Sequence, residues 1–173
     1  MTAASIDAKT GMMGKVLSKP GKWLLGTICL GVTALIGLQF YALSWNFSPS
    51  VPYTLFLVTK GAVPTHKGEF VVFKFPGKNF FKPEDRFVKK VVGMVGDRVE
   101  TQGRDVFVNG EKIATAKEKS MQGVPLAALD YDGLIPANKL FVLGMSKDSY
   151  DSRYQDVGLV DEARVVGTAI PIF

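Results

Sequence analysis

The longest apolar stretch of the chain lies near its start, and no charged residue interrupts it. From Trp23 to Thr59 there is no Asp, Glu, Lys or Arg, and the 21 residues from Trp23 to Leu43 include one strongly polar side chain, Gln39. At about 1.5 Å per residue, a helix of that length spans roughly 30 Å, the thickness of a bilayer core. Tyr41 and Trp45 supply amphipathic aromatic rings of the kind that gather at a membrane interface. The pattern therefore predicts a transmembrane helix.

Two interpretations of this segment stay open, an uncleaved signal anchor and a cleavable signal peptide. The apolar run exceeds the roughly 7–15 residues of a signal-peptide core, and Tyr41-Ala42-Leu43 is a poor small-x-small cleavage site. Both observations favour the anchor. The basic residues before it keep the N-terminus in the cytoplasm under the positive-inside rule, and they are Lys9, Lys15, Lys19 and Lys22. We expect a cytoplasmic tail over residues 1–22, a single-pass anchor over 23–44 and an exported domain over 45–173.

After the anchor, the pattern changes to short apolar runs separated by turn residues, which is typical of β-strands. The dipeptide Asn109-Gly110 between two such runs is the strongest short-range signal of a hairpin with a type I′ turn. Strands are expected over 69–75, 87–92, 98–100, 106–108, 111–113, 140–143 and 163–166. A weak helical pattern covers Ala114 to Met121, and Val51 to Val58 suits either a buried strand or a segment resting at the lipid interface. The predicted fold class is mainly β, an antiparallel sheet domain behind one transmembrane helix.

Charge and cysteine content exclude several classes of function. The net charge is +5, but the first 22 residues carry +3 and the remaining 151 residues only +2. A nucleic-acid-binding surface needs its basic excess on the folded part, so no nucleic-acid partner is expected. Cys29 and His66 are single residues of their types, so neither a disulfide framework nor a Cys/His zinc site can form within the chain. We expect no metal or other cofactor, and hydroxyls, amines and carboxylates must supply the chemistry.

Two segments of the exported domain contain a candidate nucleophile and a candidate core strand. The first, Phe47 to Pro52 (Phe-Ser-Pro-Ser-Val-Pro), follows the anchor and contains Ser48 and Ser50. Taken alone, its composition also suits an ordinary linker. The second, Lys67 to Phe73 (Lys-Gly-Glu-Phe-Val-Val-Phe), is typical of a strand in a protein core.

A third segment, Arg86 to Asp97, places two lysines inside an expected strand. Alternation puts Lys89 on the same face as Phe87 and Val91, and it puts Lys90 on the opposite face. A strand lysine usually points to solvent, and the pattern does not decide which of the two is buried.

The fourth segment, Gly144 to Tyr154, is the most specific. It contains Ser-x-Asp-Ser-Arg from Ser149 to Arg153, which a turn has little compositional reason to carry. As an isolated motif it also suits a surface loop with an Asp–Arg pair of small energetic value.

In this order behind an apolar anchor, the four segments resemble bacterial type I signal peptidases. The matching family motifs are Ser-x-Ser-Met-x-Pro, Gly-Asp-x-Val-Val-Phe, Lys-Arg-Val-Val-Gly-x-Pro-Gly-Asp and Gly-Asp-Asn-x-x-x-Ser-x-Asp-Ser-Arg. This chain departs from them at Val51, at Lys90 in place of arginine, at Val95 in place of proline and at Met145-Ser146 in place of Asp-Asn. The resemblance implies a signal-peptidase-like domain on the periplasmic side of a bacterial inner membrane.

The resemblance also implies a Ser/Lys dyad, in which Ser50 attacks the scissile carbonyl and Lys89 takes its proton. A lysine can act as a base only if its amine is neutral, and burial between apolar neighbours lowers a lysine pKa from about 10.4. The roles implied for other residues are an oxyanion hole formed by the Ser50 backbone N–H and Ser48, orientation of the amine by Ser149, support of the loop by Asp151 and Arg153, and pairing of Val71, Val72 and Phe73 with an extended substrate.

The expected partners follow from the same resemblance. They are a preprotein with a signal segment and the lipid of the inner membrane. The sequence Ser50-Val51-Pro52, the single membrane segment and the 45 residues between Asp97 and Leu143 look most like the TraF-type branch, which matures pilin precursors for conjugative transfer. The conjugative-transfer machinery is therefore a further expected partner.

Three alternatives remain open at this stage. The altered Val95 and Met145-Ser146 suit a catalytically inactive scaffold of a secretion or conjugation complex. A self-cleaving or regulatory Ser/Lys protease shares the same broad fold, although an internal Ala-Gly cleavage site is not evident. His66 could serve a histidine-based triad, but it lies in a turn-like segment.

Overall fold

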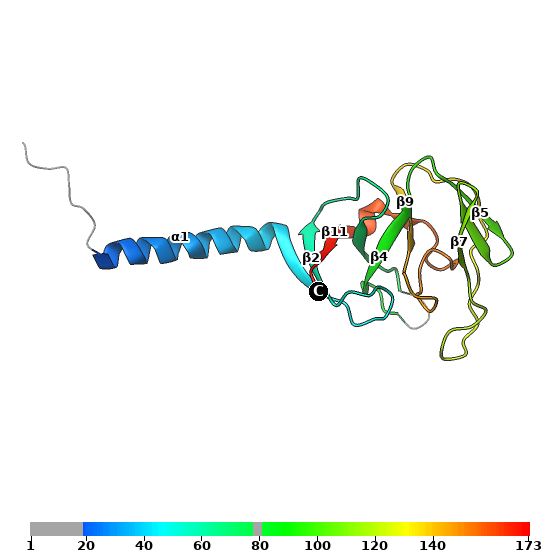
Figure 1. Cartoon of the computed structure of the whole chain (residues 1–173), viewed down its shortest axis with the longest axis horizontal. Helices are drawn as coiled ribbons and strands as arrows, with labels where there is room; N and C mark the ends of the chain where they lie inside the picture. The colour runs from blue at the N-terminus through cyan, green and yellow to red at the C-terminus, as the bar shows by residue number, and fades with distance from the viewer. Residues whose placement is uncertain (1–18, 78–80) are drawn as a thin grey trace, which may run out of the picture. The chain divides into compact units, whose positions relative to one another are not determined.

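The computed structural model describes residues 19–77 and 81–173 and divides the chain into two units, Met1–Gly37 and Leu38–Phe173. The predicted basic tail up to residue 18 lies outside the described residues. Figure 1 labels the helix and most of the strands.

The apolar run forms helix α1, Lys19–Phe40. Its segment Gly21–Phe40 has a mean hydropathy of 1.8 over its most apolar window, and by length and composition it could cross a membrane. The helix ends earlier than the predicted boundary at residue 44. The next residues form strand β1, Tyr41–Trp45, which pairs antiparallel with β2, Leu55–Lys60, along its whole length. Pairing with the next strand along the chain thus overrides the local apolar pattern at this end.

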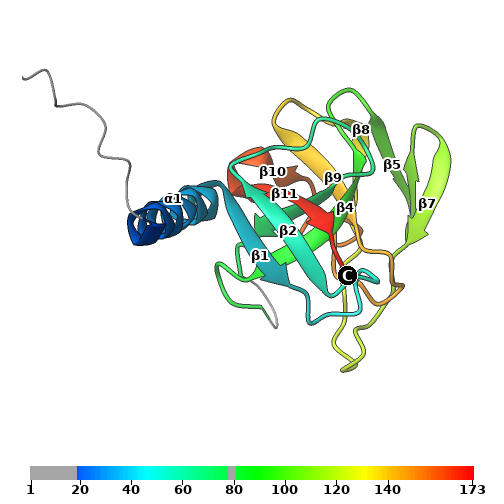
Figure 2. The same ribbon diagram turned by 60° about the vertical axis from the view of Figure 1, so that its left-hand side comes forward.

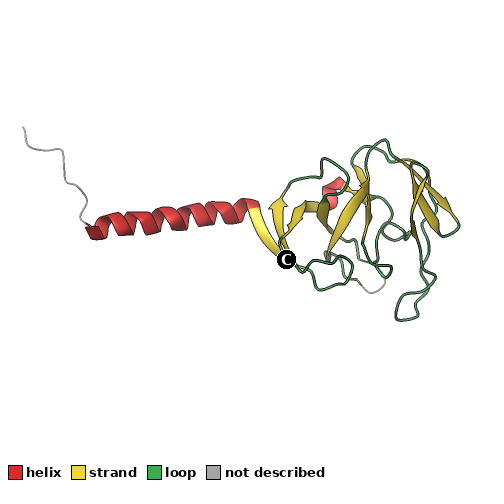
Figure 3. Cartoon of the chain, in the orientation of Figure 1, coloured by secondary structure: helices red, strands yellow, loops and turns green. Residues whose placement is uncertain are grey.

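After the end of α1, the described part of the unit from residue 38 onward is mainly antiparallel β, as predicted, and Figure 3 shows strands along it. The larger sheet has the order β1-β2-β11-β3-β4-β9-β10. The bounds of its remaining strands are β3 Phe70–Lys74, β4 Arg86–Gly93, β9 Lys139–Leu143, β10 Val160–Asp161 and β11 Val165–Pro171. A 3₁₀ turn, η1, covers Glu162–Arg164. Figure 2 shows β11 lying beside β2 within this sheet.

A smaller sheet with the order β7-β6-β5-β8 occupies the chain between β4 and β9. Its strands are β5 Arg98–Gln102, β6 Asp105–Val108, β7 Glu111–Thr115 and β8 Asp132–Leu134. The predicted hairpin is confirmed, because Asn109 and Gly110 join β6 to β7 with φ of 52° and 81°, the positive pair that a type I′ turn requires. The helical prediction for residues 114–121 is wrong, since β7 runs to Thr115 and a loop follows it.

The central strand of the larger sheet, β3, is buried on both faces. Val72 packs in a cluster with Phe56 and Val58, whereas Val71 and Phe73 pack in a second cluster with residues of β4 and β9. Because Phe56 and Val58 are buried, the segment from Val51 to Val58 is the buried strand of the two interpretations above.

Both edges of β3 are occupied, by β11 on one side and β4 on the other. An extended substrate needs a free edge for backbone hydrogen bonds. The prediction that Val71, Val72 and Phe73 pair with substrate is therefore wrong, because their backbone groups already take part in the sheet.

Candidate active site

The candidate nucleophile lies in the connection between β1 and β2, residues 46–54, which we call the nucleophile turn. Ser50 is buried, with 8% of its surface exposed, and its hydroxyl forms a 2.9 Å hydrogen bond with the hydroxyl of Ser48. The Ser50 carbonyl accepts backbone N–H bonds from Met145 at 2.6 Å and Ser146 at 3.3 Å. Within the described residues, the Ser50 backbone N–H forms no hydrogen bond. The turn is thus fixed through one backbone group of Ser50, while the N–H and the hydroxyl remain available to a reacting carbonyl.

Lys89 lies in the middle of β4, directly opposite Val71 of β3, and only 4% of its surface is exposed. Its Nζ is 5.4 Å from the centroid of the Phe87 ring and donates to the Ser149 hydroxyl at 2.9 Å. Burial lowers the pKa of Lys89 to about 8, the Asp151 carboxylate opposes this shift, and the Arg153 guanidinium adds to it. About a tenth of this amine is therefore neutral at pH 7, whereas an ordinary lysine is almost fully charged there.

The neighbouring Lys90 has a different environment. It pairs with Phe70 of β3, is half-buried, and lines a separate cavity near Lys67 and Asn109. Successive side chains of a strand point to opposite faces, so Lys89 and Lys90 lie on opposite faces of the sheet. Ser50 and Lys89 line one cavity, and Lys90 is not among its lining residues.

The Ser149–Arg153 segment forms a buried network that supports the amine. Arg153 donates to Asp151 through Nε and Nη2, each at 2.8 Å, and Nη2 also reaches the Ser149 carbonyl at 3.0 Å. The Asp151 Oδ2 atom, which accepts from Arg153 Nη2, also accepts the Gly144 backbone N–H at 2.8 Å. Ser152 ties the segment to β9, because its hydroxyl accepts the Val142 backbone N–H at 3.0 Å. The buried Asp–Arg pair thus connects the loop that holds Ser149 to the end of β9.

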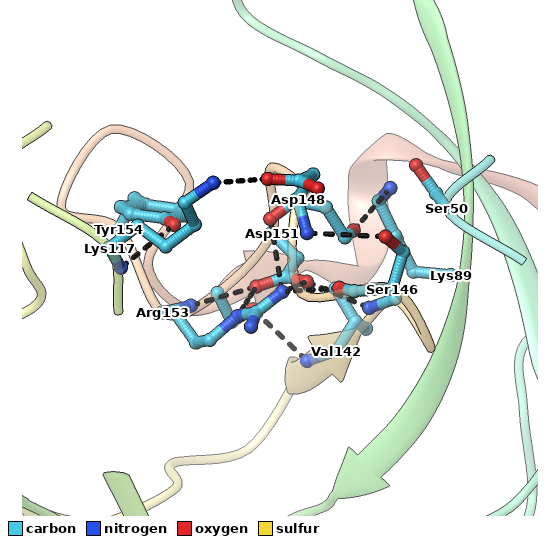
Figure 4. Close-up of polar contacts among 12 residues, drawn as sticks. Ser50, Lys89, Lys117, Val142, Ser146, Asp148, Asp151, Arg153 and Tyr154 are labelled. Atoms are coloured by element: carbon cyan, nitrogen blue, oxygen red, sulfur yellow. Dashed lines mark hydrogen bonds and ion pairs between the residues drawn. The ribbon is translucent and has the colours of Figure 1, made fainter. Parts of the chain in front are cut away.

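The cavity that contains Ser50 and Lys89 has a volume of about 670 Å³. In the view of Figure 4, the Lys89 amine points toward the Ser50 hydroxyl, with the Ser146–Arg153 loop next to it. Other parts of the cavity are lined by Ser48, by the end of β1 and by aromatic rings that include Phe87. The structure therefore brings the predicted nucleophile, base and oxyanion donor to one cavity, and it places Ser149, Asp151 and Arg153 around the base.

Sequence reasoning missed the importance of Gly144. A Cβ atom at this position would lie 1.9 Å from Ser149 Oγ and 3.0 Å from the Ser50 carbonyl oxygen. The only residue without a Cβ is therefore required where the end of β9 meets both the nucleophile turn and the Ser149 hydroxyl. The sequence offers one clue to this role, a glycine directly after an apolar strand. It does not show which atoms pack against that glycine.

Neither a histidine triad nor a metal centre is supported by the described residues. His66 lies in the turn before β3, with Nδ1 2.7 Å from Glu69 Oε1, and it does not line the cavity of Ser50. Among residues 19–77 and 81–173, no group of three or more His, Cys, Asp or Glu side chains could hold a metal ion.

Comparison with known proteins identifies the family. The family model described as signal peptidase, peptidase S26, matches residues 22–173, which is most of the chain. The chain belongs to this family. The match includes α1 from Lys22 onward, both sheets and every residue of the cavity described above.

Several curated S26 relatives are similar to this chain. It is 31% identical over 114 residues to signal peptidase I of Bacillus licheniformis, covering 62% of this chain and 58% of that protein. It is 33% identical over 94 residues to signal peptidase I T of Bacillus subtilis (strain 168), covering 50% and 48%. A longer match, 25% identical over 169 residues, covers 85% of this chain and 76% of signal peptidase I of Leptolyngbya laminosa.

The chain spans about half the length of the first of these S26 relatives. Among solved structures, a crystal structure of a signal peptidase I from Enterococcus faecalis V583 is 23% identical with a TM-score of 0.39, covering 62% of this chain and 97% of that one. The TraF-type subdivision predicted above is not confirmed by these comparisons.

Proposed function

We propose that this chain is a membrane-anchored serine endopeptidase that removes signal segments from exported preproteins. One observation carries the proposal: a buried lysine amine with a pKa of about 8 lies in the same cavity as the Ser50 hydroxyl. A serine hydroxyl is a weak nucleophile and needs an adjacent base. A lysine near its pKa can accept that proton and return it later.

The proposed reaction is acyl transfer in two steps. Ser50 Oγ bonds to the scissile carbonyl carbon while Lys89 Nζ takes the hydroxyl proton, and the resulting ammonium then protonates the leaving amine as the C–N bond breaks. Lys89, again neutral, takes a proton from the water that attacks the acyl-enzyme. The ammonium then returns this proton to Ser50 Oγ as the ester C–O bond breaks and the new carboxyl end leaves. The oxygen that becomes negative in each step is met by the Ser50 backbone N–H and the Ser48 hydroxyl.

Ser149 supports this mechanism by orienting the base. Its hydroxyl accepts one proton of the Lys89 amine at 2.9 Å, which directs the nitrogen within the cavity. Asp151 and Arg153 hold the Ser149 backbone and carry no proton in the reaction. The altered Met145 and Ser146 do not weaken the proposal, because their contacts to Ser50 are made by backbone N–H groups that any residue but proline provides.

The substrate is proposed to bind as an extended strand against the free side of β1. β1 is the edge strand of the larger sheet, and its residues Ser44 and Trp45 line the cavity together with Arg86 and Val88 from the start of β4. An edge strand offers unpaired backbone groups for β-augmentation. This binding mode replaces the one predicted for β3.

The proposed location is a bacterial inner membrane, with the N-terminus in the cytoplasm and the catalytic unit in the periplasm. The spanning length of α1 and the lysines before it support this orientation. We propose a pilin precursor or another conjugative-transfer component as substrate, which rests on the TraF-type features of the sequence.

The decisive experiment uses the full chain in detergent and a peptide that carries a signal segment and its cleavage site. We expect Ser50→Ala and Lys89→Met to abolish cleavage, a loss of at least about 10³-fold for a nucleophile or its base. Lys90→Met is the matched control, because it removes the adjacent amine from the other face of β4, and it should retain cleavage. Retention of cleavage by the first two variants refutes the dyad, and a wild-type chain without activity favours the scaffold interpretation.

A further inference from the structure

Asn46 makes more hydrogen bonds to the nucleophile turn than any residue assigned a role above. It lies between β1 and Ser48, and its backbone N–H donates to the Thr54 carbonyl at 2.8 Å, which closes the base of the turn. Its side-chain amide then contacts the turn from inside. The side chain is half-buried and lines the cavity of Ser50.

The Asn46 Nδ2 group faces three carbonyl oxygens of the turn. These belong to Ser48 at 2.8 Å, Tyr53 at 3.0 Å and Val51 at 3.4 Å. The Asn46 Oδ1 atom faces two donors, the Ser48 backbone N–H at 3.1 Å and the Ser48 hydroxyl at 3.0 Å. Only this orientation of the amide places donors against acceptors, because a flipped amide would set its oxygen against three carbonyls. The network therefore fixes the amide uniquely.

This arrangement determines where the Ser48 hydroxyl lies. The Ser48 hydroxyl has one proton, and two acceptors lie within its reach, Asn46 Oδ1 at 3.0 Å and Ser50 Oγ at 2.9 Å. Asn46 Oδ1, itself fixed by the Ser48 backbone N–H, therefore anchors the Ser48 oxygen beside the nucleophile, from where the proton can turn to the oxygen of a bound carbonyl. The Ser48 side chain is thus held in one rotamer beside the nucleophile. Without Asn46 the same hydroxyl could rotate among several staggered positions.

We propose that Asn46 is a positioning residue, which holds the Ser48 hydroxyl beside Ser50 so that it can act as an oxyanion donor. The role rests on the proposed function, since it acts through the Ser48–Ser50 pair. Preorganised donors stabilise the developing charge because their orientation is already set when the reaction begins. Asn46 itself does not touch the reacting atoms.

The test is a double-mutant cycle on the full chain in detergent, with kcat and KM measured on the signal-bearing peptide. Asn46→Ala should lower kcat about 10- to 100-fold with KM changed less than about twofold, since misorientation near the reacting centre acts on the transition state. In a Ser48→Ala background the same substitution should lower kcat less than about threefold, because the hydroxyl that Asn46 orients is already absent. Equal losses in both backgrounds would overturn the proposal.

Thr54→Val is the matched control for general loosening of the turn. The Thr54 hydroxyl bonds to the Phe173 carbonyl at 3.3 Å and does not reach Ser48 or Ser50. We expect its kcat to stay within about twofold of the wild type. A loss as large as that of Asn46→Ala would show that any weakened contact of the turn has the same effect, and would also overturn the proposal.

Hydrogen exchange on the wild-type chain provides a check that needs no variant. The Ser48 backbone N–H should exchange slowly, because Asn46 Oδ1 accepts it, and exchange at the rate of an unprotected amide contradicts the network. Failure of the proposed function has a different signature. A wild-type chain that exchanges slowly at Ser48 yet cleaves nothing removes both the peptidase activity and the catalytic role of Asn46.

Discussion

At the residue scale, the chemistry of the site depends on the charge state of one amine. Lys89 loses most of its contact with solvent in β4, and this burial lowers its pKa further than the nearby Asp151 carboxylate raises it. The same burial that makes the amine a usable base is unfavourable for the charged form in the folded protein. Arg153, which pairs with Asp151, reduces the attraction of that carboxylate for the amine.

The pH dependence of cleavage should report this pKa. A base works only when deprotonated, so kcat/KM should rise about tenfold per pH unit below about 8 and level off above it. The measurement is a pH profile with the signal-bearing peptide, and Lys90→Met should leave the midpoint in place. A midpoint near the ordinary lysine value of 10.5 would contradict burial of the catalytic amine.

The choice between the two lysines shows where sequence reasoning stops. Alternation correctly separated Lys89 from Lys90, but it could not say which face of β4 surrounds an amine with protein. Both faces of this strand carry buried valines, Val88 on one and Val91 on the other. Only the family resemblance selected Lys89, and the structure agrees in burying it more deeply.

At the scale of elements, the site is formed where three separate segments meet. The β1–β2 turn brings Ser50, β4 brings Lys89, and the loop after β9 brings Ser149. Two of these segments meet at Gly144, directly after β9, where Ser149 and the Ser50 carbonyl leave no room for a side chain. Whether a glycine is needed for such a close contact depends on how neighbouring backbone segments run past it, and the sequence around the glycine does not show this.

Gly144→Ala should therefore reduce activity strongly. The new methyl would overlap Ser149 Oγ, at 1.9 Å, and push the amine's hydrogen-bond partner away, so we expect a loss of kcat of about 10²-fold or more. Gly133→Ala in β8 is the matched control, because its Cβ would meet Tyr131 atoms at ordinary distances of 3.6–3.7 Å. Normal kcat in the Gly144 variant would show that the loop can move without affecting the base.

Elements that are determined by their own residues were predicted correctly, whereas elements that are determined by a pairing partner were not. The β6–β7 hairpin was predictable because Asn109 and Gly110 themselves adopt positive φ. By contrast, the apolar pattern predicts residues 41–44 as the end of the membrane helix, whereas they belong to β1 because β2 pairs with them. The neighbours of β3 were equally invisible, because β11 joins it from the far end of the sequence.

At the scale of the whole unit from residue 38 onward, the part of the larger sheet formed by β1, β2 and β11 has an apolar, exposed face. Leu43 of β1 and Ile170 of β11 lie on either side of Leu57 of β2, and their side chains are 66% and 60% exposed. Trp45 extends this apolar face along β1 to the cavity. Exposed apolar patches mark surfaces that contact a partner or a membrane, and a preprotein presents its signal segment within lipid.

We expect Leu43→Lys with Ile170→Lys to impair cleavage of a preprotein embedded in vesicles while leaving cleavage of a short soluble peptide unchanged. Each buried apolar side chain contributes about 1.5–3 kcal/mol to lipid contact, so the vesicle reaction should slow at least about tenfold. Leu134→Lys, at a similarly exposed site in β8 of the smaller sheet, is the control and should affect neither reaction. An equal loss on both substrates would place the effect in the catalytic machinery.

β11 joins two halves of the larger sheet, and the strands of both halves precede it in the sequence. The sheet order places it between β2, which follows the nucleophile turn, and β3 with β4, which carry the base. Ser50 and Lys89 are synthesised early, but the strand that joins their halves of the sheet is completed only at Pro171. Under the proposed function, we therefore expect Ser50 and Lys89 to come together only after the final strand of the chain has docked between the two halves of the sheet.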